Sequence, residues 1–235
     1  MRYSSSFKSA PDAGFSLLEL AIVLVILGII GSLGLPLLTA HITRAALLKT
    51  HGHQAYVVSA LAAFVEKNRR FPCPAEPHKQ GEPFGLAQEN CRMDKARGIV
   101  PFKTLGISEV YARDGFTRLM TYVVEPELTK RQINPYEESG GNITLKTEEG
   151  LPVIPLPKTG EKNPNYIAFI IISHGESGSG AYLGNGQPGK LTGVSLSVQK
   201  RENSDHTFVF REGSDDIVRW ESRDQFLKHY VEKAQ

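Results

Sequence analysis

Apolar residues are concentrated near the start of the chain. Between residues 15 and 40 the only ionisable side chain is Glu19, and residues 20–38 are apolar except for three glycines and one serine. At a rise of about 1.5 Å per residue, roughly twenty helical residues cross a hydrocarbon core of about 30 Å. The pattern therefore predicts a membrane-spanning helix over residues 15–40, preceded by a polar leader over residues 1–14.

A second pattern follows and is typical of an amphipathic helix. Apolar residues recur at spacings of three, four and seven, at Leu48, Ala55, Val58, Ala62 and Val65, and the stripe is broadened by Val57, Leu61 and Phe64. A basic turn at residues 67–70 suits the negative end of the helix dipole, and Phe71-Pro72 ends the pattern. The sequence therefore predicts that the helix continues over residues 41–70 and packs by one face on a folded domain.

Beyond residue 71 the pattern changes to short runs rich in β-branched and aromatic residues. These predicted strands lie at residues 119–124, 143–146, 166–173, 194–198, 207–210 and 217–219. The run 166–173 is the most apolar, which predicts a strand in the middle of a sheet, against the helix. Ser222 and Gln225 fit a capping box, so a short helix is expected to close the chain. The predicted fold class is α+β, with a long N-terminal helix packed on an antiparallel β-sheet in a β-rich domain over residues 71–235.

Composition and charge narrow the function classes. The chain has 27 basic and 25 acidic residues, a balance that does not favour a nucleic-acid partner, and it contains no nucleic-acid-binding motif. It contains two cysteines, so neither a four-cysteine zinc site nor a scaffold of several disulfides can form.

Three interpretations compete for the N-terminus. A secretory signal peptide explains the basic leader but normally has a shorter apolar core and a small-x-small cleavage site. A plain membrane anchor explains the length of the apolar run. It leaves Glu19 unexplained, because an unpaired charge at bilayer depth costs a few kcal/mol or more.

The third interpretation rests on the sequence Gly-Phe-Ser-Leu-Leu-Glu at residues 14–19, followed by the long apolar run. This stretch resembles the class III signal of type IV prepilins and type II secretion pseudopilins. The resemblance implies that a prepilin peptidase cleaves after Gly14 and methylates Phe15, and that Glu19 becomes the fifth mature residue. Pro36 falls where many pilins have a proline that loosens the helix. Residues 71–75, 100–106 and 114–118 also resemble elements of a subset of prepilin-like proteins.

The resemblance also implies a cellular place and partners. It predicts a single-pass protein of the bacterial inner membrane, with its C-terminal domain in the periplasm, that later enters a pilus or pseudopilus filament. The partners it implies are the prepilin peptidase, other pilin or pseudopilin subunits and an inner-membrane assembly platform. It implies no enzyme activity and no cofactor.

Glu19 has a physical role in this interpretation. Cleavage after Gly14 exposes an α-amino group on Phe15, which is mostly cationic at neutral pH because its unperturbed pKa is about 8. A carboxylate four residues along a helix lies one turn from that amine, within one chain or between neighbours. We therefore expect Glu19 to set the axial register between subunits. The alternative is a solvated glutamate at the membrane interface with no part in assembly.

Cys73 and Cys91 predict a disulfide if the domain faces the oxidising periplasm. A catalytic thiol is the alternative. No Cys-x-x-Cys motif and no histidine motif accompany either cysteine, and prolines flank Cys73 on both sides.

Other patterns fail as catalytic motifs. The Gly-x-Gly-x-x-Gly at residues 184–189 lacks a following helix, and the serine–histidine stretch at residues 173–180 has Ser179 where a nucleophile elbow at Ser177 needs glycine. We therefore expect His174 to be structural, and a contact between Asp114 and Arg118 to staple a turn.

An acidic region near the C-terminus raises the question of calcium. Asn203, Asp205, Asp215 and Asp216 supply only part of the six to eight oxygens that calcium prefers. A solvated loop and a calcium site both remain open for this region, and no metal site is predicted.

Together these observations predict a prepilin-like structural subunit of a type IV pilus or type II secretion pseudopilus. The alternative is an unprocessed, membrane-anchored periplasmic enzyme or binding protein.

Overall fold

The structure is a computed structural model that describes residues 16–77, 81, 83–92, 96–130, 140–147, 149–154, 166–182, 207–209 and 214–231. Side chains are described throughout these ranges except at residues 31–37, 207, 209, 230 and 231. The chain divides into two compact units, Met1–Arg44 and Ala45–Gln235.

The two helical patterns of the sequence form one helix, α1, which covers Leu17–Asn68. In the first unit its described apolar side chains are exposed, from Leu17 to Ile30. In the described part of the chain, no helix is both long and apolar enough to cross a membrane. The membrane span over residues 15–40 stays a prediction from the sequence. Pro36 lies within α1, and its loosening effect likewise stays a prediction.

The second half of α1 buries one face in the second unit, as the sequence predicts, but the buried positions differ from the prediction before residue 57. The buried side chains are Thr50, Gln54, Val57, Val58, Leu61, Ala62 and Val65. The prediction is wrong for Leu48, which is 66% exposed, and for Ala55, which is also exposed. The polar residues Thr50 and Gln54 occupy the buried face instead, because each makes a hydrogen bond there.

The helix also ends two residues before the predicted boundary at residue 70. Its last residue is Asn68, and Arg69 adopts a left-handed conformation with φ of 55°. The backbone N–H of Arg69 still donates to Val65 O at 2.8 Å. This is an αL-type helix end, reached before Phe71-Pro72.

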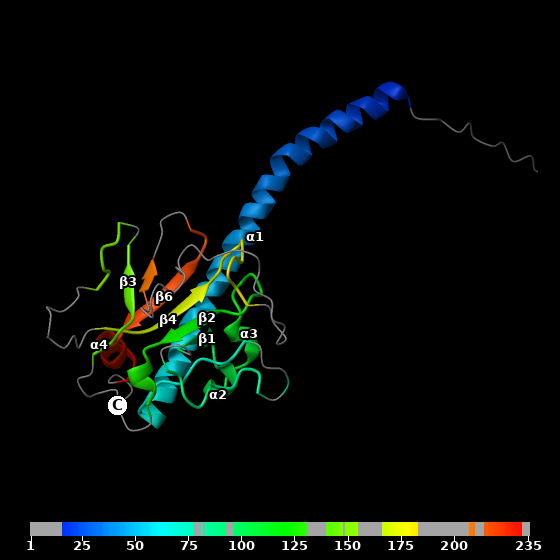
Figure 1. The fold of residues 1–235 in the computed structure, drawn as a ribbon. Coiled ribbons are helices and arrows are strands. Elements are labelled where there is room, and N and C mark those ends of the chain that lie inside the picture. The colour runs from blue at the N-terminus through cyan, green and yellow to red at the C-terminus, as the bar shows by residue number, and fades with distance from the viewer. Residues whose placement is uncertain are drawn as a thin grey trace, which may run out of the picture. The chain divides into compact units, whose positions relative to one another are not determined.

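A four-stranded antiparallel sheet forms the centre of the second unit (Figure 1). Its strands stand in the order β1 (Arg97–Ile99), β2 (Thr121–Val124), β4 (Ile167–Ser173) and β6 (Ile217–Ser222). The predicted central strand is confirmed, since β4 pairs with β2 on one side and with β6 on the other. The α+β fold class is confirmed with it.

Both faces of β4 are buried, which explains its unbroken apolar sequence. One face packs with Val57, Leu61 and Val65 of α1 in a large core that includes Tyr122 and Phe169. The opposite face contributes to a smaller core with members from β3 and β5. These two strands, β3 (Thr144–Lys146) and β5 (Thr207–Val209), pair in parallel in a separate two-stranded sheet. They therefore depart from the purely antiparallel sheet that the sequence predicts.

Short helices connect the strands, and the sequence pattern predicts only the last of them. The others are α2 (Phe102–Leu105), α3 (Glu109–Ala112) and η2 (Pro126–Thr129). The predicted capping serine is present at α4 (Arg223–Phe226), where Ser222 Oγ accepts from Gln225 N at 3.3 Å, and Gln225 Oε1 accepts from the same hydroxyl at 3.3 Å. A wider turn, η3 (Leu227–Val231), continues from α4.

The turn between α3 and β2 lies directly against α1. Thr50 Oγ1 accepts from Gly115 N at 2.9 Å and donates to Ala46 O at 2.9 Å. A Cβ atom added at Gly115 would lie 1.9 Å from Ala46 O. A carbonyl of the helix backbone cannot rotate away as a side chain can, so this position has no room for a side chain.

We predict that Gly115→Ala destabilises the protein by about 1–3 kcal/mol, since overpacking a tight contact forces the backbone to shift. Gly140→Ala is the matched control, because nothing lies within 4 Å of a Cβ atom added at Gly140. Denaturant unfolding of the full chain in detergent measures both. Equal stability of the two variants would contradict the close contact between the turn and the helix.

Candidate functional site

The N-terminal segment is the first candidate, and the structure describes it from Ser16 onward. Gly14 and Phe15, the predicted cleavage and methylation positions, lie outside the described residues. Ser16 caps α1: its Oγ accepts from Leu18 N at 3.3 Å, and its backbone oxygen accepts from Leu20 N at 3.1 Å. Sequence reasoning missed this cap. The Ser-x-x-Glu spacing of Ser16 and Glu19 is the signal that could have found it.

Glu19 lies exposed in the first turn of α1. A carboxylate in this position is favoured by the positive end of the helix dipole, typically by 0.3–1 kcal/mol. The helix dipole therefore stabilises the carboxylate of Glu19 at this position. Along the helix beside and beyond Glu19, large apolar side chains are exposed, such as Leu18 at 70% and Ile30 at 62%. Contiguous apolar surface of this kind marks contact with lipid or with another protein.

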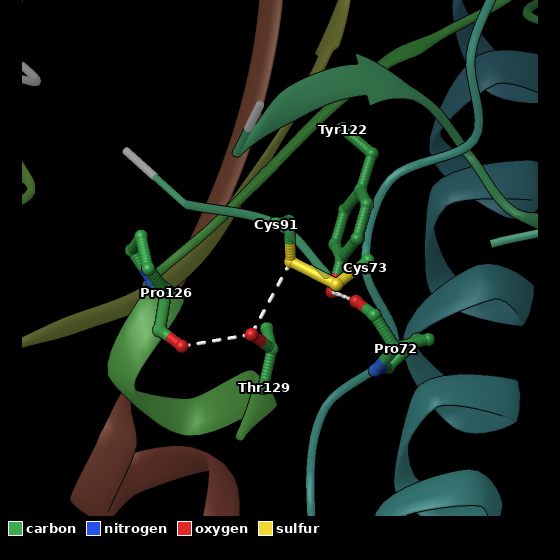
Figure 2. The surroundings of a disulfide bond; sticks show 6 residues. All are labelled: Pro72, Cys73, Cys91, Tyr122, Pro126 and Thr129. Carbon is green, nitrogen blue, oxygen red and sulfur yellow. Dashed lines mark hydrogen bonds between the residues drawn. A yellow bond between two sulfur atoms is a disulfide. The ribbon is translucent and has the colours of Figure 1, made fainter. Parts of the chain in front are cut away.

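The disulfide between Cys73 and Cys91 is the second candidate site (Figure 2). Its Cα atoms are 5.6 Å apart, and both cysteines are buried. Neither cysteine is free, so the structure has no thiol for catalysis. The bridge ties the segment that follows α1 to a segment 18 residues further along.

Buried polar groups surround this disulfide. Thr129 Oγ1 lies 3.2 Å from Cys91 Sγ and donates to Pro126 O at 2.7 Å. Tyr122 OH donates to Pro72 O at 3.3 Å. Burial raises the pKa of Tyr122, so the phenol keeps the proton that this bond requires. These contacts fix the bridge in the core, which indicates a structural role.

The structure describes only some of the residues in the serine–histidine stretch, the acidic region and the glycine-rich stretch. Asp215 accepts from Ser177 N at 2.5 Å and from Ser177 Oγ at 3.1 Å, so Ser177 is bound to a carboxylate. Asn203 and Asp205 lie outside the described residues, as does the glycine-rich stretch 184–189. Among the described residues, no group of three or more His, Cys, Asp or Glu could hold a metal ion.

The predicted staple at Asp114 exists, but through the backbone. Asp114 Oδ1 accepts from Phe116 N at 2.9 Å and from Arg118 N at 2.8 Å. The Arg118 guanidinium points elsewhere and donates to the backbone oxygens of Gly175 and Glu176. The turn is therefore connected to the loop that follows β4.

Comparison with known protein families identifies the N-terminal segment. Residues 10–35 match the family model of the prokaryotic N-terminal methylation motif. The chain therefore carries a class III signal, the N-terminal feature of type IV pilin-like proteins. The motif implies processing by a prepilin peptidase, and it favours a structural subunit over an enzyme. Comparisons with curated proteins and with solved structures found no match.

A buried carboxylate that sequence reasoning missed lies just after β2. Glu125 is fully buried, and its Oε2 accepts from Asn142 N at 2.7 Å and from Ile143 N at 3.2 Å. Burial raises the pKa of Glu125, and the hydrogen bonds from residues 142 and 143 oppose that shift in part. The carboxylate therefore connects the segment before β3 to the end of β2. The free-energy cost of burying it depends on pH, because only its ionised form is disfavoured by burial.

We predict that Glu125 makes stability depend on pH in the acid range. Because its folded pKa is raised, its favourable contribution is fully present below its unfolded pKa and is lost as pH rises through the folded pKa. The unfolding free energy of the wild type minus that of Glu125→Gln should therefore fall as pH rises. Denaturant unfolding across pH measures this, with the exposed Glu176→Gln as control. A difference that rises with pH would refute the assignment.

Proposed function

We propose that this chain is a prepilin-like structural subunit. In this proposal a prepilin peptidase cleaves it after Gly14 and methylates Phe15, and the mature chain assembles into a type IV pilus or a type II secretion pseudopilus. The observation that carries the proposal is the match of residues 10–35 to the N-terminal methylation motif. A long helix α1 leading into an antiparallel sheet supports it.

We place the mature chain first in the inner membrane of a bacterium, spanning it once with residues 15–40. The exposed apolar side chains between Leu17 and Ile30 support a lipid or helix environment for this segment. The domain over residues 71–235 would face the periplasm. The disulfide between Cys73 and Cys91 supports this side, because disulfides persist in oxidising compartments.

Assembly in this proposal depends on partners that meet the first half of α1. They are the prepilin peptidase, other pilin or pseudopilin subunits and an inner-membrane assembly platform. Apolar helices packed side by side have few contacts that fix their stagger. The carboxylate of Glu19 and the new α-amino group of Phe15 supply such a contact. Each charge is costly in an apolar environment unless the opposite charge lies beside it, so the pair favours one stagger. The proposal includes no catalytic residue, no metal and no cofactor.

The processing step is tested by the intact mass and N-terminal sequence of membrane-extracted protein, with and without a co-expressed prepilin peptidase. We expect a mature chain that begins at methylated Phe15 only when the peptidase is present. Gly14→Leu should leave the leader attached, because the bulky side chain blocks the cleavage position. An unprocessed Met1 terminus in both samples would instead favour an anchored periplasmic enzyme or binding protein.

The assembly step is tested by Glu19→Ala and by Glu19→Gln, which keeps the size but removes the charge. We expect normal cleavage of both variants and a loss of about tenfold or more in filament incorporation, where tenfold corresponds to about 1.4 kcal/mol. Ser59→Ala, an exposed position on the same helix, is the control. Wild-type incorporation of Glu19→Gln would refute the register role while leaving processing intact.

A further inference from the structure

His174 lies at the end of β4 between the two neighbouring strands of the sheet. Its side chain is completely buried, and its Nε2 is 2.8 Å from Thr121 Oγ1 of β2. On the other side its Nδ1 is 3.6 Å from Oδ1 of Asp216, directly before β6. Nδ1 makes no hydrogen bond within the described structure. A shift of a few tenths of an ångström would close this gap to hydrogen-bonding distance.

The segments packed around this imidazole carry several charged groups. Asp114 Oδ2 accepts from Ser173 Oγ at 2.7 Å, next to the histidine in the chain. Asp215 accepts from Ser177, and the Arg118 guanidinium donates to the oxygens of Gly175 and Glu176. Asp216, whose side chain is 2% exposed, is the carboxylate placed beside Nδ1. The ring therefore faces a buried acceptor on each side.

The same end of the sheet also holds α1. Gln54 Nε2 donates to Ile217 O at 2.9 Å, one residue after Asp216. Ile217 is also the register partner of Ser173, one residue before His174. A shorter contact between His174 and Asp216 therefore also affects Ile217, whose backbone oxygen binds Gln54 of the helix.

We propose that His174 is a proton-dependent latch that joins β2, β4 and β6. A neutral imidazole carries one N–H, whereas a protonated imidazole donates from both nitrogens. The protonated ring donates to Thr121 Oγ1 from Nε2 and to Asp216 from Nδ1 at the same time. A buried charge is favourable only with a partner in place, and Asp216 is that partner. Mild acid therefore strengthens the connection among the three strands and the hold of the sheet on α1.

The experiment is thermal unfolding of the full chain in detergent micelles at about pH 5.5 and about pH 8, the range in which histidine changes charge. The variants are Asp216→Asn, which removes the charged acceptor, and His51→Gln, which removes an exposed imidazole as control. The wild type should melt at a higher temperature than Asp216→Asn. We expect this difference in melting temperature to be about 2–4 °C larger at the lower pH than at the higher pH. The difference for His51→Gln should not change with pH. A difference for Asp216→Asn that is equal at the two pH values, or larger at the higher one, overturns the latch.

A second measurement on the wild type covers the case in which Asp216→Asn fails to fold. Nuclear magnetic resonance of the full chain with ¹⁵N-labelled histidine reports the protonation of each ring nitrogen. We expect the signals of His174 to show protons on both nitrogens at about pH 5.5 and on one at about pH 8. A ring that carries a single proton throughout overturns the proposal. Neither measurement depends on processing or filament assembly, so the latch and the proposed function can fail separately.

Discussion

The contact between the second half of α1 and the four-stranded sheet is the constraint on which the folded unit depends. Val57, Leu61 and Val65 contribute to the same buried core as Phe169 of β4. Burying a side chain of this kind contributes about 1.5–3 kcal/mol relative to leaving it exposed. This apolar contact holds the helix on the sheet but does not by itself fix where the helix lies along its axis. Two hydrogen bonds supply that position, because they require defined partners: Gly115 N donates to Thr50 Oγ1, and Gln54 Nε2 donates to Ile217 O.

Polar contacts join α1 to the turn at residues 114–118 and to the start of β6, and they join that turn to the loop after β4. Gly115, Arg118 and Asp215 each bind a segment distant in sequence. Where both groups are buried, as in the bond from Ser173 Oγ to Asp114 Oδ2 of this turn, loss of one partner leaves a polar group unsatisfied at a cost of about 1–3 kcal/mol. The close approach at Gly115 and the ring of His174 belong to this same junction. A change at either position therefore affects the hold of the sheet on the helix as well as its local turn.

How much the sequence predicts depends on the range of the interactions involved. The helix α1 and the strand β4 were predictable because dense or periodic apolar residues bury large surfaces. The buried face of α1 was predictable over residues 57–65 but not at Thr50 and Gln54, which look solvent-facing until their distant partners are known. The strand β1 has three residues, and the isolated bridge between Ala75 and Ile99 extends its pairing, so no local pattern reveals it. The same holds for the candidate sites: the N-terminal motif is local in sequence, whereas the surroundings of Glu125 and His174 are assembled by the fold.

Helix α1 presents two different surfaces, and the proposed function requires both. In the second unit its buried face is covered by the protein's own sheet, so that part of the helix has its partner within the chain. In the first unit the described apolar side chains are exposed, with one carboxylate in the first turn. Apolar surface supplies attraction without fixing direction, whereas a charge stabilised by a single partner defines a position. In the proposed function a subunit adds to a filament at a defined stagger, and Glu19 beside exposed leucines and isoleucines is the combination that we propose for it.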